Sequence, residues 1–256
     1  MKTEWIRTGR AVLGVWIIVL AAITEPGVAD EVVVFPDANL EQAVRTELAI
    51  PAGTPITTVD MLDLTRLAGA YVGDLTGIEY ASNLQDLDIL ESSFTNLSPL
   101  SELGTLTSLR LYGHQLTDLS PLSSLGGLEV LDLSQGELTS ASLPALSGLT
   151  NLTYLDLGEN AIADISSLHS LTGLRVLALG YNPVSDVSIL EDFHSVSGLS
   201  LDYTDVENLS SLADLNSLIS LKINGLGISD ISSLAGLTNL IGLYASNNAL
   251  SDLSAL

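Results

Sequence analysis

The sequence repeats itself about every 22 residues, and this period constrains the fold more than any other feature. A leucine-rich segment of the form L-x-x-L-x-L recurs along the chain. Position 1 of the successive units, numbered 1 to 9, falls at Leu64, Leu84, Leu106, Leu128, Leu152, Leu174, Val196, Leu218 and Leu240. The intervals are 20, 22, 22, 24, 22, 22, 22 and 22 residues. Such regularity predicts a stack of one short supersecondary element.

Each unit combines two periodicities. Positions 4 and 6 are apolar and alternate with polar neighbours, which is typical of a short strand with one buried face. Positions 11, 14, 17 and 20 are apolar at every third residue, as expected of a 3-10-like or extended return segment. In unit 5 these positions are Leu155, Leu157, Ile162, Ile165, Leu168 and Leu171. Each unit is therefore predicted to be one coil, whose inward leucines are covered only by the neighbouring coils.

The units resemble the leucine-rich repeats of a known family. Residues 152–173 (LTYLDLGENAIADISSLHSLTG) are similar to the 22-residue repeats of bacterial internalins and of the eukaryotic regulatory subunit of protein phosphatase 1. Residues 35–45 (FPDANLEQAVR), followed by Pro51, Gly53 and residues 56–60 (ITTVD), resemble the N-terminal cap of exported bacterial proteins of this kind. The resemblance covers residues 35–256 and implies an α/β repeat fold. The expected architecture is a right-handed leucine-rich repeat solenoid with eight or nine parallel strands on its concave face.

The residues themselves also predict a cap before the repeats. Asp37 or Asn39 is suited to begin a helix that runs to about Leu48. One face of this helix would carry the apolar residues that seal the first coil, namely Leu40, Ala43, Val44 and Leu48. The expected organisation is a signal peptide at residues 1–29, a cap at residues 30–63, and nine repeats at residues 64–256, the last of them truncated.

The N-terminus has the pattern of a secretory signal peptide. Lys2, Arg7 and Arg10 precede an uncharged run at residues 11–23, and small residues end this region at Gly27 and Ala29. Cleavage is predicted after Ala29, which would change the net charge from -23 to -24. The alternative is an uncleaved anchor, but a helix of this length covers only roughly 20 Å of a roughly 30 Å hydrocarbon core. Export without any cysteine favours a bacterial secreted or cell-surface protein.

Composition excludes several classes of function. The chain is acidic, with 8 Lys and Arg against 31 Asp and Glu, and would repel nucleic acid. The absence of cysteine excludes thiolate chemistry. His114, His169 and His194 have no metal-ligand spacing and are interpreted as surface or turn residues. The sequence shows no G-x-S-x-G motif, activated nucleophile, acid–base pair or metal-ligand cluster, so no enzymatic activity, cofactor or metal is predicted.

Two further positions are predicted to support the coils. Acids recur at position 13 as Asp118, Asp164, Asp186, Asp230 and Asp252. They could form a calcium ladder, but the nonapeptide spacing of calcium β-rolls is absent, and capping of free backbone N–H groups explains them. Position 9 is Asn in units 5, 6 and 9, where a hydrogen-bonded asparagine ladder is expected. Elsewhere the ladder is broken, and the backbone polar groups of those turns must find other hydrogen-bond partners.

The outward positions 3, 5, 7 and 8 are predicted to line the concave face of the sheet. The candidate partner-binding residues there are Asp86, Asp88, Arg110, Tyr112, Asp132, Tyr154, Asp156, Glu159, Tyr181, Asp202, Tyr203, Lys222 and Tyr244. Five of the seven tyrosines in the chain belong to this set. One explanation is the preference of aromatic residues for strand surfaces. The other is a recognition surface whose acids favour a basic protein or a hydroxyl-rich glycan.

The function predicted from these features is a non-enzymatic binding or adhesion module of an exported bacterial protein. The alternative is a structural fragment of a longer surface protein, whose remaining part would carry an anchoring or catalytic function. Unit 9 stops at Ala255 and Leu256 without a cap. Truncation is the expected reason, and a frayed end or self-association through this end is the alternative.

Overall fold

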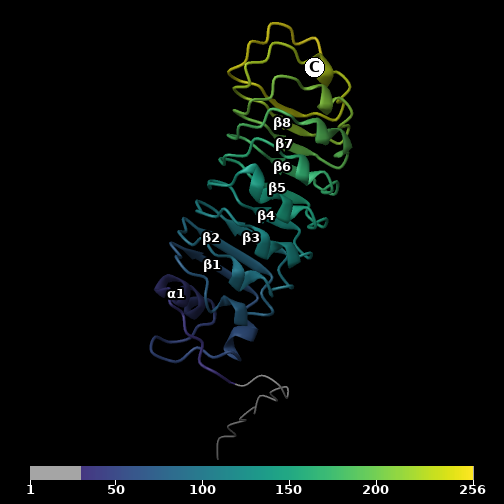
Figure 1. The fold of residues 1–256 in the computed structure, drawn as a ribbon. Coiled ribbons are helices and arrows are strands. Elements are labelled where there is room, and N and C mark those ends of the chain that lie inside the picture. Colours follow the sequence, from purple (N-terminus) through teal and green to yellow (C-terminus); the bar gives the residue numbers. More distant parts are fainter. Residues whose placement is uncertain (1–29, 256) are drawn as a thin grey trace, which may run out of the picture.

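The computed structural model describes residues 30–255, so the predicted signal peptide lies outside the described residues. The chain forms an elongated, curved stack of coils that begins with a helix (Figure 1). All nine strands form one parallel sheet, in the order in which they occur along the chain. This is the predicted right-handed leucine-rich repeat solenoid, with a strand on one side of each coil and a 3-10 return on the other.

The elements follow the repeat. The helix α1 spans Ala38–Glu47. The strands are β1 (Arg66–Ala70), β2 (Asp86–Leu90), β3 (Ser108–Leu111), β4 (Val130–Asp132), β5 (Tyr154–Asp156), β6 (Val176–Ala178), β7 (Gly198–Ser200), β8 (Ser220–Lys222) and β9 (Gly242–Tyr244). The 3-10 helices are η1 (Asp60–Asp63), η2 (Ile78–Tyr80), η3 (Ser98–Leu100), η4 (Ser120–Ser124), η5 (Ser140–Leu146), η6 (Ser166–Leu168), η7 (Ser188–Asp192), η8 (Ser210–Leu212) and η9 (Ser232–Leu234).

The strand register confirms the alignment of the repeats. Position 4 of each unit pairs with position 4 of the next, as Leu155 does with Leu177. Both side chains are fully buried, as are Leu157 and Leu179 at position 6. The inward residues of the strands and of the 3-10 returns thus form one continuous column of leucines. No coil could bury this surface alone, because each depends on the coils above and below it.

The acids at position 13 cap the 3-10 returns, as predicted. The Asp118 Oδ1 atom accepts a hydrogen bond of 2.8 Å from the backbone N–H of Ser120, the first residue of η4. Equivalent bonds link Asp164 to Ser166, Asp186 to Ser188, Asp230 to Ser232 and Asp252 to Ser254. Accepting this bond favours the charged carboxylate and lowers the pKa of Asp118.

The helix α1 covers the first coil. Asp37 is its N-cap, and its Oδ1 atom accepts hydrogen bonds from the backbone N–H groups of Asn39 and Leu40 at 2.8 and 2.9 Å. Its second oxygen accepts a bond of 2.7 Å from Gly73, which ties the helix to unit 1. Leu40 and Val44 are fully buried, so the helix closes this end of the leucine column.

The asparagines at position 9 form the predicted ladder. The Asn182 Oδ1 atom accepts a bond of 2.9 Å from the backbone N–H of Ile162, and its Nδ2 group donates to Leu157 O at 2.8 Å. Both partners belong to unit 5, so the side chain links two coils. Asn160 and Asn248 repeat this arrangement.

The interpretation of His114 as a surface or turn residue is wrong with respect to its exposure, because this side chain is 2% exposed. It lies at position 9 of unit 3 and takes over the role of an asparagine. Its Nδ1 atom accepts a bond of 3.2 Å from the N–H of Leu116, which leaves the proton on Nε2 to be donated to Leu133 O at 3.0 Å in unit 4. Position 9 of unit 4 is Gly136, where an added Cβ would lie 2.1 Å from the His114 ring. The missing side chain thus makes room for the histidine.

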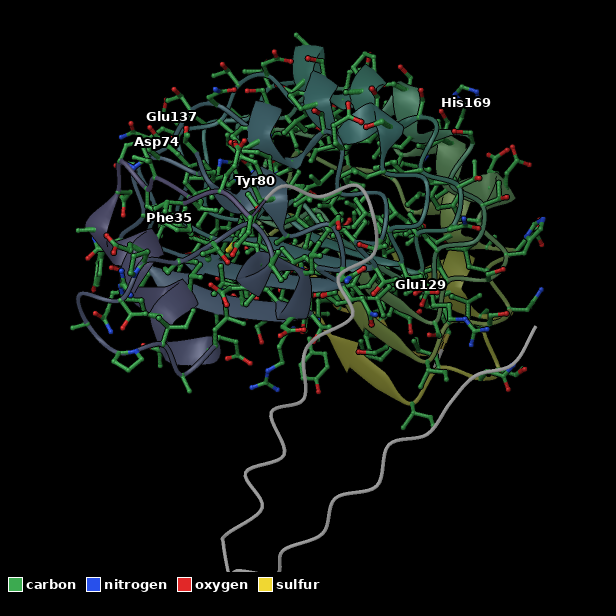
Figure 2. All side chains as sticks on the ribbon, turned by 90° about the horizontal axis from the view of Figure 1, so that it is seen from below. Phe35, Asp74, Tyr80, Glu129, Glu137 and His169 are labelled. Atoms are coloured by element: carbon green, nitrogen blue, oxygen red, sulfur yellow. The ribbon has the colours of Figure 1, made fainter. Side chains whose placement is uncertain are left out.

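The other two histidines are exposed, and His169 extends from the outer side of the stack (Figure 2).

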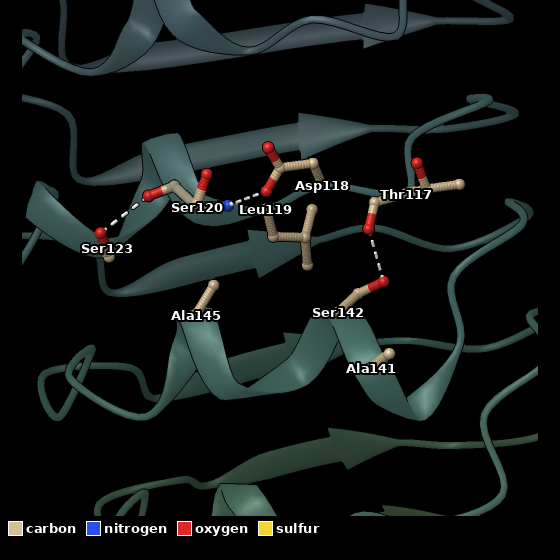
Figure 3. Close-up of a pocket in the computed structure, with 8 residues that line it drawn as sticks. All are labelled: Thr117, Asp118, Leu119, Ser120, Ser123, Ala141, Ser142 and Ala145. Atoms are coloured by element: carbon tan, nitrogen blue, oxygen red, sulfur yellow. Dashed lines mark hydrogen bonds between the residues drawn. The ribbon is translucent and has the colours of Figure 1, made fainter.

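The two extra residues of unit 4 lie on the convex side. They lengthen its 3-10 return η5 to seven residues. Between η4 and η5 lies a shallow depression, lined by small and polar residues that include Ser123, Ala141 and Ala145 (Figure 3). The Ser142 hydroxyl donates a bond of 2.7 Å to Thr117 O across it. The insertion therefore leaves the sheet register intact.

The last coil is less well covered than the inner coils. Leu253 is 57% exposed, whereas the equivalent Ile231 of unit 8 is 1% exposed. Among residues 30–255, no helix is long and apolar enough to cross a membrane.

The leucine column gives a direct stability prediction. Truncating Leu155 or Leu177 to Ala should lower the free energy of unfolding by roughly 2 to 5 kcal/mol, because each leaves a cavity in a fully buried position. Urea unfolding followed by circular dichroism measures this loss. The control Ile219→Ala, at a residue that is 46% exposed, should change the stability far less. Equal effects of the three substitutions would contradict the register.

The buried histidine gives a pH prediction. Burial disfavours the imidazolium and lowers the pKa of His114 from its ordinary value of 6.5. The unfolded chain therefore binds this proton more readily, so His114 should reduce the free energy of unfolding as the pH falls below about 6.5. Urea unfolding between pH 7.5 and 5 should show a steeper loss for the wild type than for His114→Asn. Parallel profiles of the two proteins would refute the assignment.

Candidate binding surface

The candidate surface is the concave face of the sheet together with the turn that follows each strand. Eight of the predicted residues lie on strands: Asp86, Asp88, Arg110, Asp132, Tyr154, Asp156, Lys222 and Tyr244. The other five, Tyr112, Glu159, Tyr181, Asp202 and Tyr203, follow the strand ends. The candidate set therefore spans eight coils, from β2 to β9.

Position 8 differs from the prediction because it does not belong to the sheet. In every unit it has a positive φ, between 47° at Glu91 and 70° at Gly225. Tyr181 and Tyr203 have φ values of 58° and 54°. This left-handed conformation is uncommon for residues other than glycine. The strand preference of aromatic residues therefore cannot explain these tyrosines, nor Tyr71, which occupies the same position in unit 1 and was missed.

The N-terminal part of the concave face is polar and charged. The Arg110 guanidinium lies 3.4 Å from the Asp86 carboxylate and donates a bond of 2.7 Å to the Ser108 hydroxyl. Asp88 lies beside them, and within residues 30–255 its buried Oδ1 atom has no hydrogen-bond partner. Burial raises the pKa of Asp88, and the nearby acids Asp86 and Asp132 add to this effect, while Arg110 opposes it. Arg110 thus only partly neutralises the acids around it.

The central part is built around two half-buried tyrosines. Burial raises the pKa of Tyr112 and of Tyr154 to about 12 in each case, with smaller contributions from neighbouring carboxylates such as Asp132. The Tyr154 hydroxyl donates a hydrogen bond of 3.4 Å to the Asp156 Oδ2 atom. Burial also raises the pKa of Asp156, although its bonds from Gly158 and Tyr154 oppose this. Both tyrosines are therefore neutral hydrogen-bond donors at physiological pH.

Two exposed tyrosines stack on each other at the edge of this face. The ring centroids of Tyr181 and Tyr203 are 4.8 Å apart with an interplanar angle of 22°. Their side chains are 55% and 43% exposed. The Tyr203 hydroxyl accepts a bond of 2.9 Å from Asn247 Nδ2, and a Cβ at Gly225 would lie 2.4 Å from the Tyr203 ring. The pair is thus held in place while it exposes a large aromatic surface.

The concave face is hollowed at β6 and β7, because the outward residues of these two strands are small. Val176, Ala178, Gly198 and Ser200 occupy positions 3 and 5 of β6 and β7. Together with Tyr154, Asp156 and Lys222 they line a hollow of about 220 Å³. The predicted site did not include this hollow, because that site consists only of large aromatic and charged side chains. The signal was present in the repeat alignment as small residues at the same positions of adjacent units.

The described residues contain no constellation suited to a metal. Within residues 30–255, no group of three or more His, Asp or Glu side chains is arranged to hold a metal ion. The carboxylates at the 3-10 helices bind backbone N–H groups instead.

Comparisons with known proteins identify the repeat. The leucine rich repeat family model matches residues 104–162 and 126–184. No curated protein matches the chain. Among solved structures, an internalin (inlF) from Listeria monocytogenes is 30% identical with a TM-score of 0.72, and the match covers 86% of this chain and 72% of that one.

Other solved structures extend this likeness. Internalin C2 of the same organism is 33% identical with a TM-score of 0.78, over 83% of this chain and 94% of its own. The functional domain of InlJ from Listeria monocytogenes shares only the fold, at 20% identity and a TM-score of 0.51, over 86% of this chain and 62% of its own. The repeat register, the helical cap and the identity to two internalins together show that the chain belongs to the internalin-like family of leucine-rich repeat proteins.

Proposed function

We propose that the protein is a non-enzymatic binding or adhesion module, exported by a bacterium, which holds a protein partner on its concave face. The repeat fold and the family support the general function of a protein-binding module. The observation that supports binding on the concave face is the stacked and exposed pair Tyr181 and Tyr203, together with the half-buried Tyr112 and Tyr154. Tyrosines of this kind supply contact area at a low entropic cost, and they are enriched in protein interfaces.

The proposed partner is a basic protein surface. The chain has a net charge of -23, and the concave face carries Asp86, Asp88, Asp156 and Asp202, whereas the predicted Asp132 is only 5% exposed and is not available for direct contact. Such a surface attracts a positively charged partner and increases its rate of association. Hydroxyl-rich glycans are the second ligand class, because stacked aromatic rings beside carboxylates also suit sugar rings. Salt separates the two, since only a charged partner should lose affinity strongly as ionic strength rises.

Export and a surface location are part of this proposal. They are supported by the N-terminal sequence pattern of residues 1–29.

The binding surface is tested with a displayed library of random peptides. Peptides selected on the wild-type chain should lose binding to the double variant Tyr154→Ala/Tyr181→Ala by at least tenfold, because two aromatic contacts are removed. The control is Tyr80→Ala on the convex 3-10 helix η2, a residue that is 44% exposed, and it should retain binding. Affinities are measured by biolayer interferometry, and urea unfolding verifies that both variants remain folded.

Two outcomes would contradict the proposal. Peptides that bind the double variant as well as the wild type would place the binding surface elsewhere. A large loss of stability in the double variant would instead assign these tyrosines a structural role.

A further inference from the structure

The hollow on the concave face has a floor formed by three neighbouring strands. Val176 and Ala178 come from β6, Gly198 and Ser200 from β7, and Ser220 from β8. At Gly198 an added Cβ would lie 3.5 Å from the Val176 side chain, so the glycine leaves this space open. With a volume of about 220 Å³, the hollow is large enough for one side chain but too small for a domain element. Its floor is continuous, because the strands that form it are paired in register.

The walls of the hollow carry opposite charges. On one side stand Tyr154 and Asp156 of β5, and on the other side stands Lys222 of β8. The Asp156 Oδ1 atom accepts a bond of 2.8 Å from Gly158 N, while Oδ2 accepts only the longer bond of 3.4 Å from the Tyr154 hydroxyl. None of the ion pairs among residues 30–255 includes Asp156. Oδ2 therefore retains capacity for a donor that enters the hollow.

The negative charge of the Asp156 carboxylate is also only partly balanced by its neighbours. It is half-buried, and burial raises its pKa, while the nearby Asp132 acts in the same direction. The hydrogen bonds from Gly158 N and the Tyr154 hydroxyl oppose this rise in pKa, and the Lys222 ammonium opposes it only weakly. A cation placed in the hollow would remove this cost, since an opposite charge stabilises a partly desolvated carboxylate. Charge complementarity thus favours a cationic occupant on the Asp156 side.

The shape favours arginine over lysine. A guanidinium is planar and can lie flat on a floor of Val176, Ala178 and Gly198, beside the Tyr154 ring. It also donates several hydrogen bonds in one plane, which suits Asp156 and the hydroxyls of Ser200 and Ser220. Lys222 repels the guanidinium from the opposite wall and would direct it toward Asp156. Lysine offers only a compact charge that gains little from such a floor.

We propose that this hollow is the site at which the concave face receives one arginine side chain of its protein partner. The inference rests on the proposed function and specifies one contact within it. Because the two walls carry opposite charges, substitutions on the two walls should change the affinity in opposite directions. Removing the Asp156 charge should weaken binding of a cation, whereas removing the Lys222 charge should strengthen it.

The experiment uses the full chain, labelled with ¹⁵N, and two short probes. One is the capped peptide acetyl-Gly-Arg-Gly-amide, and the other replaces arginine by citrulline, a neutral side chain of similar shape. The arginine probe should shift the amide signals of Val176, Ala178, Gly198 and Ser200, while the citrulline probe should not. Asp156→Asn should weaken the arginine probe at least fivefold, and Lys222→Gln should tighten it at least twofold. The asparagine retains the acceptor for Gly158 N, so the fold is preserved.

The matched control is Glu191→Gln on the convex helix η7, which removes the same charge far from the hollow and should leave the affinity unchanged. Several results would overturn the inference: equal binding of the two probes, shifts spread over the whole acidic surface, or equal affinities of Asp156→Asn and Glu191→Gln. Weaker binding of the arginine probe to Lys222→Gln would also overturn it, because a lysine beside a bound guanidinium should repel it. If the selected library peptides still require Tyr154 and Tyr181 but ignore Asp156 and Lys222, only the arginine site fails and the proposed function stands.

Discussion

The burial of leucines between successive coils is the interaction on which the rest of the structure depends. Each coil exposes an apolar ring above and below, and only a neighbour in the same register can cover it. Once Leu155 is placed over Leu177, positions 4 and 6 point inward, and positions 3 and 5 must point outward. The leucine column therefore also fixes which side chains are available to a partner. Outward residues such as Tyr154 and Lys222 lie outside this column.

Most features that the sequence predicted follow from the residue type at a fixed position within one unit. The strands, the 3-10 returns and the carboxylates that cap them all follow from residue type at a fixed position, as Asp118 and Ser120 illustrate. Two features that it did not predict depend on several units at once. The interlocking of His114 with Gly136 requires the separation of neighbouring coils, and the hollow requires three strands side by side. The left-handed turn at position 8 was hidden because its residue types, among them tyrosine and glutamate, do not favour that conformation.

The candidate surface lies on one hydrogen-bonded sheet, but the size of its outward side chains changes along the solenoid. Large and charged side chains occupy the strands from β2 to β5, whereas small residues occupy β6 and β7. Both regions rest on the same hydrogen-bonded sheet, so their separation is fixed. Along the solenoid, a partner would meet a raised polar region and then a depression, with the stacked tyrosines at the edge of the same two coils as the depression. Preorganisation of this kind lowers the entropic cost of binding.

The asparagine ladder is interrupted in the same region. Position 9 is Thr204 in unit 7, whose hydroxyl bonds within its own coil, and Leu226 in unit 8, which offers no hydrogen bond from its side chain. The stacked rings of Tyr181 and Tyr203, and the bond from Asn247 to Tyr203, cross these junctions instead. At these two junctions, the exposed tyrosines thus supply the side-chain link between coils that asparagine supplies in units 5, 6 and 9. A partner that packs on these rings would therefore contact the junctions between coils as well as the outer surface, and its binding is expected to hold units 6 to 9 more firmly together.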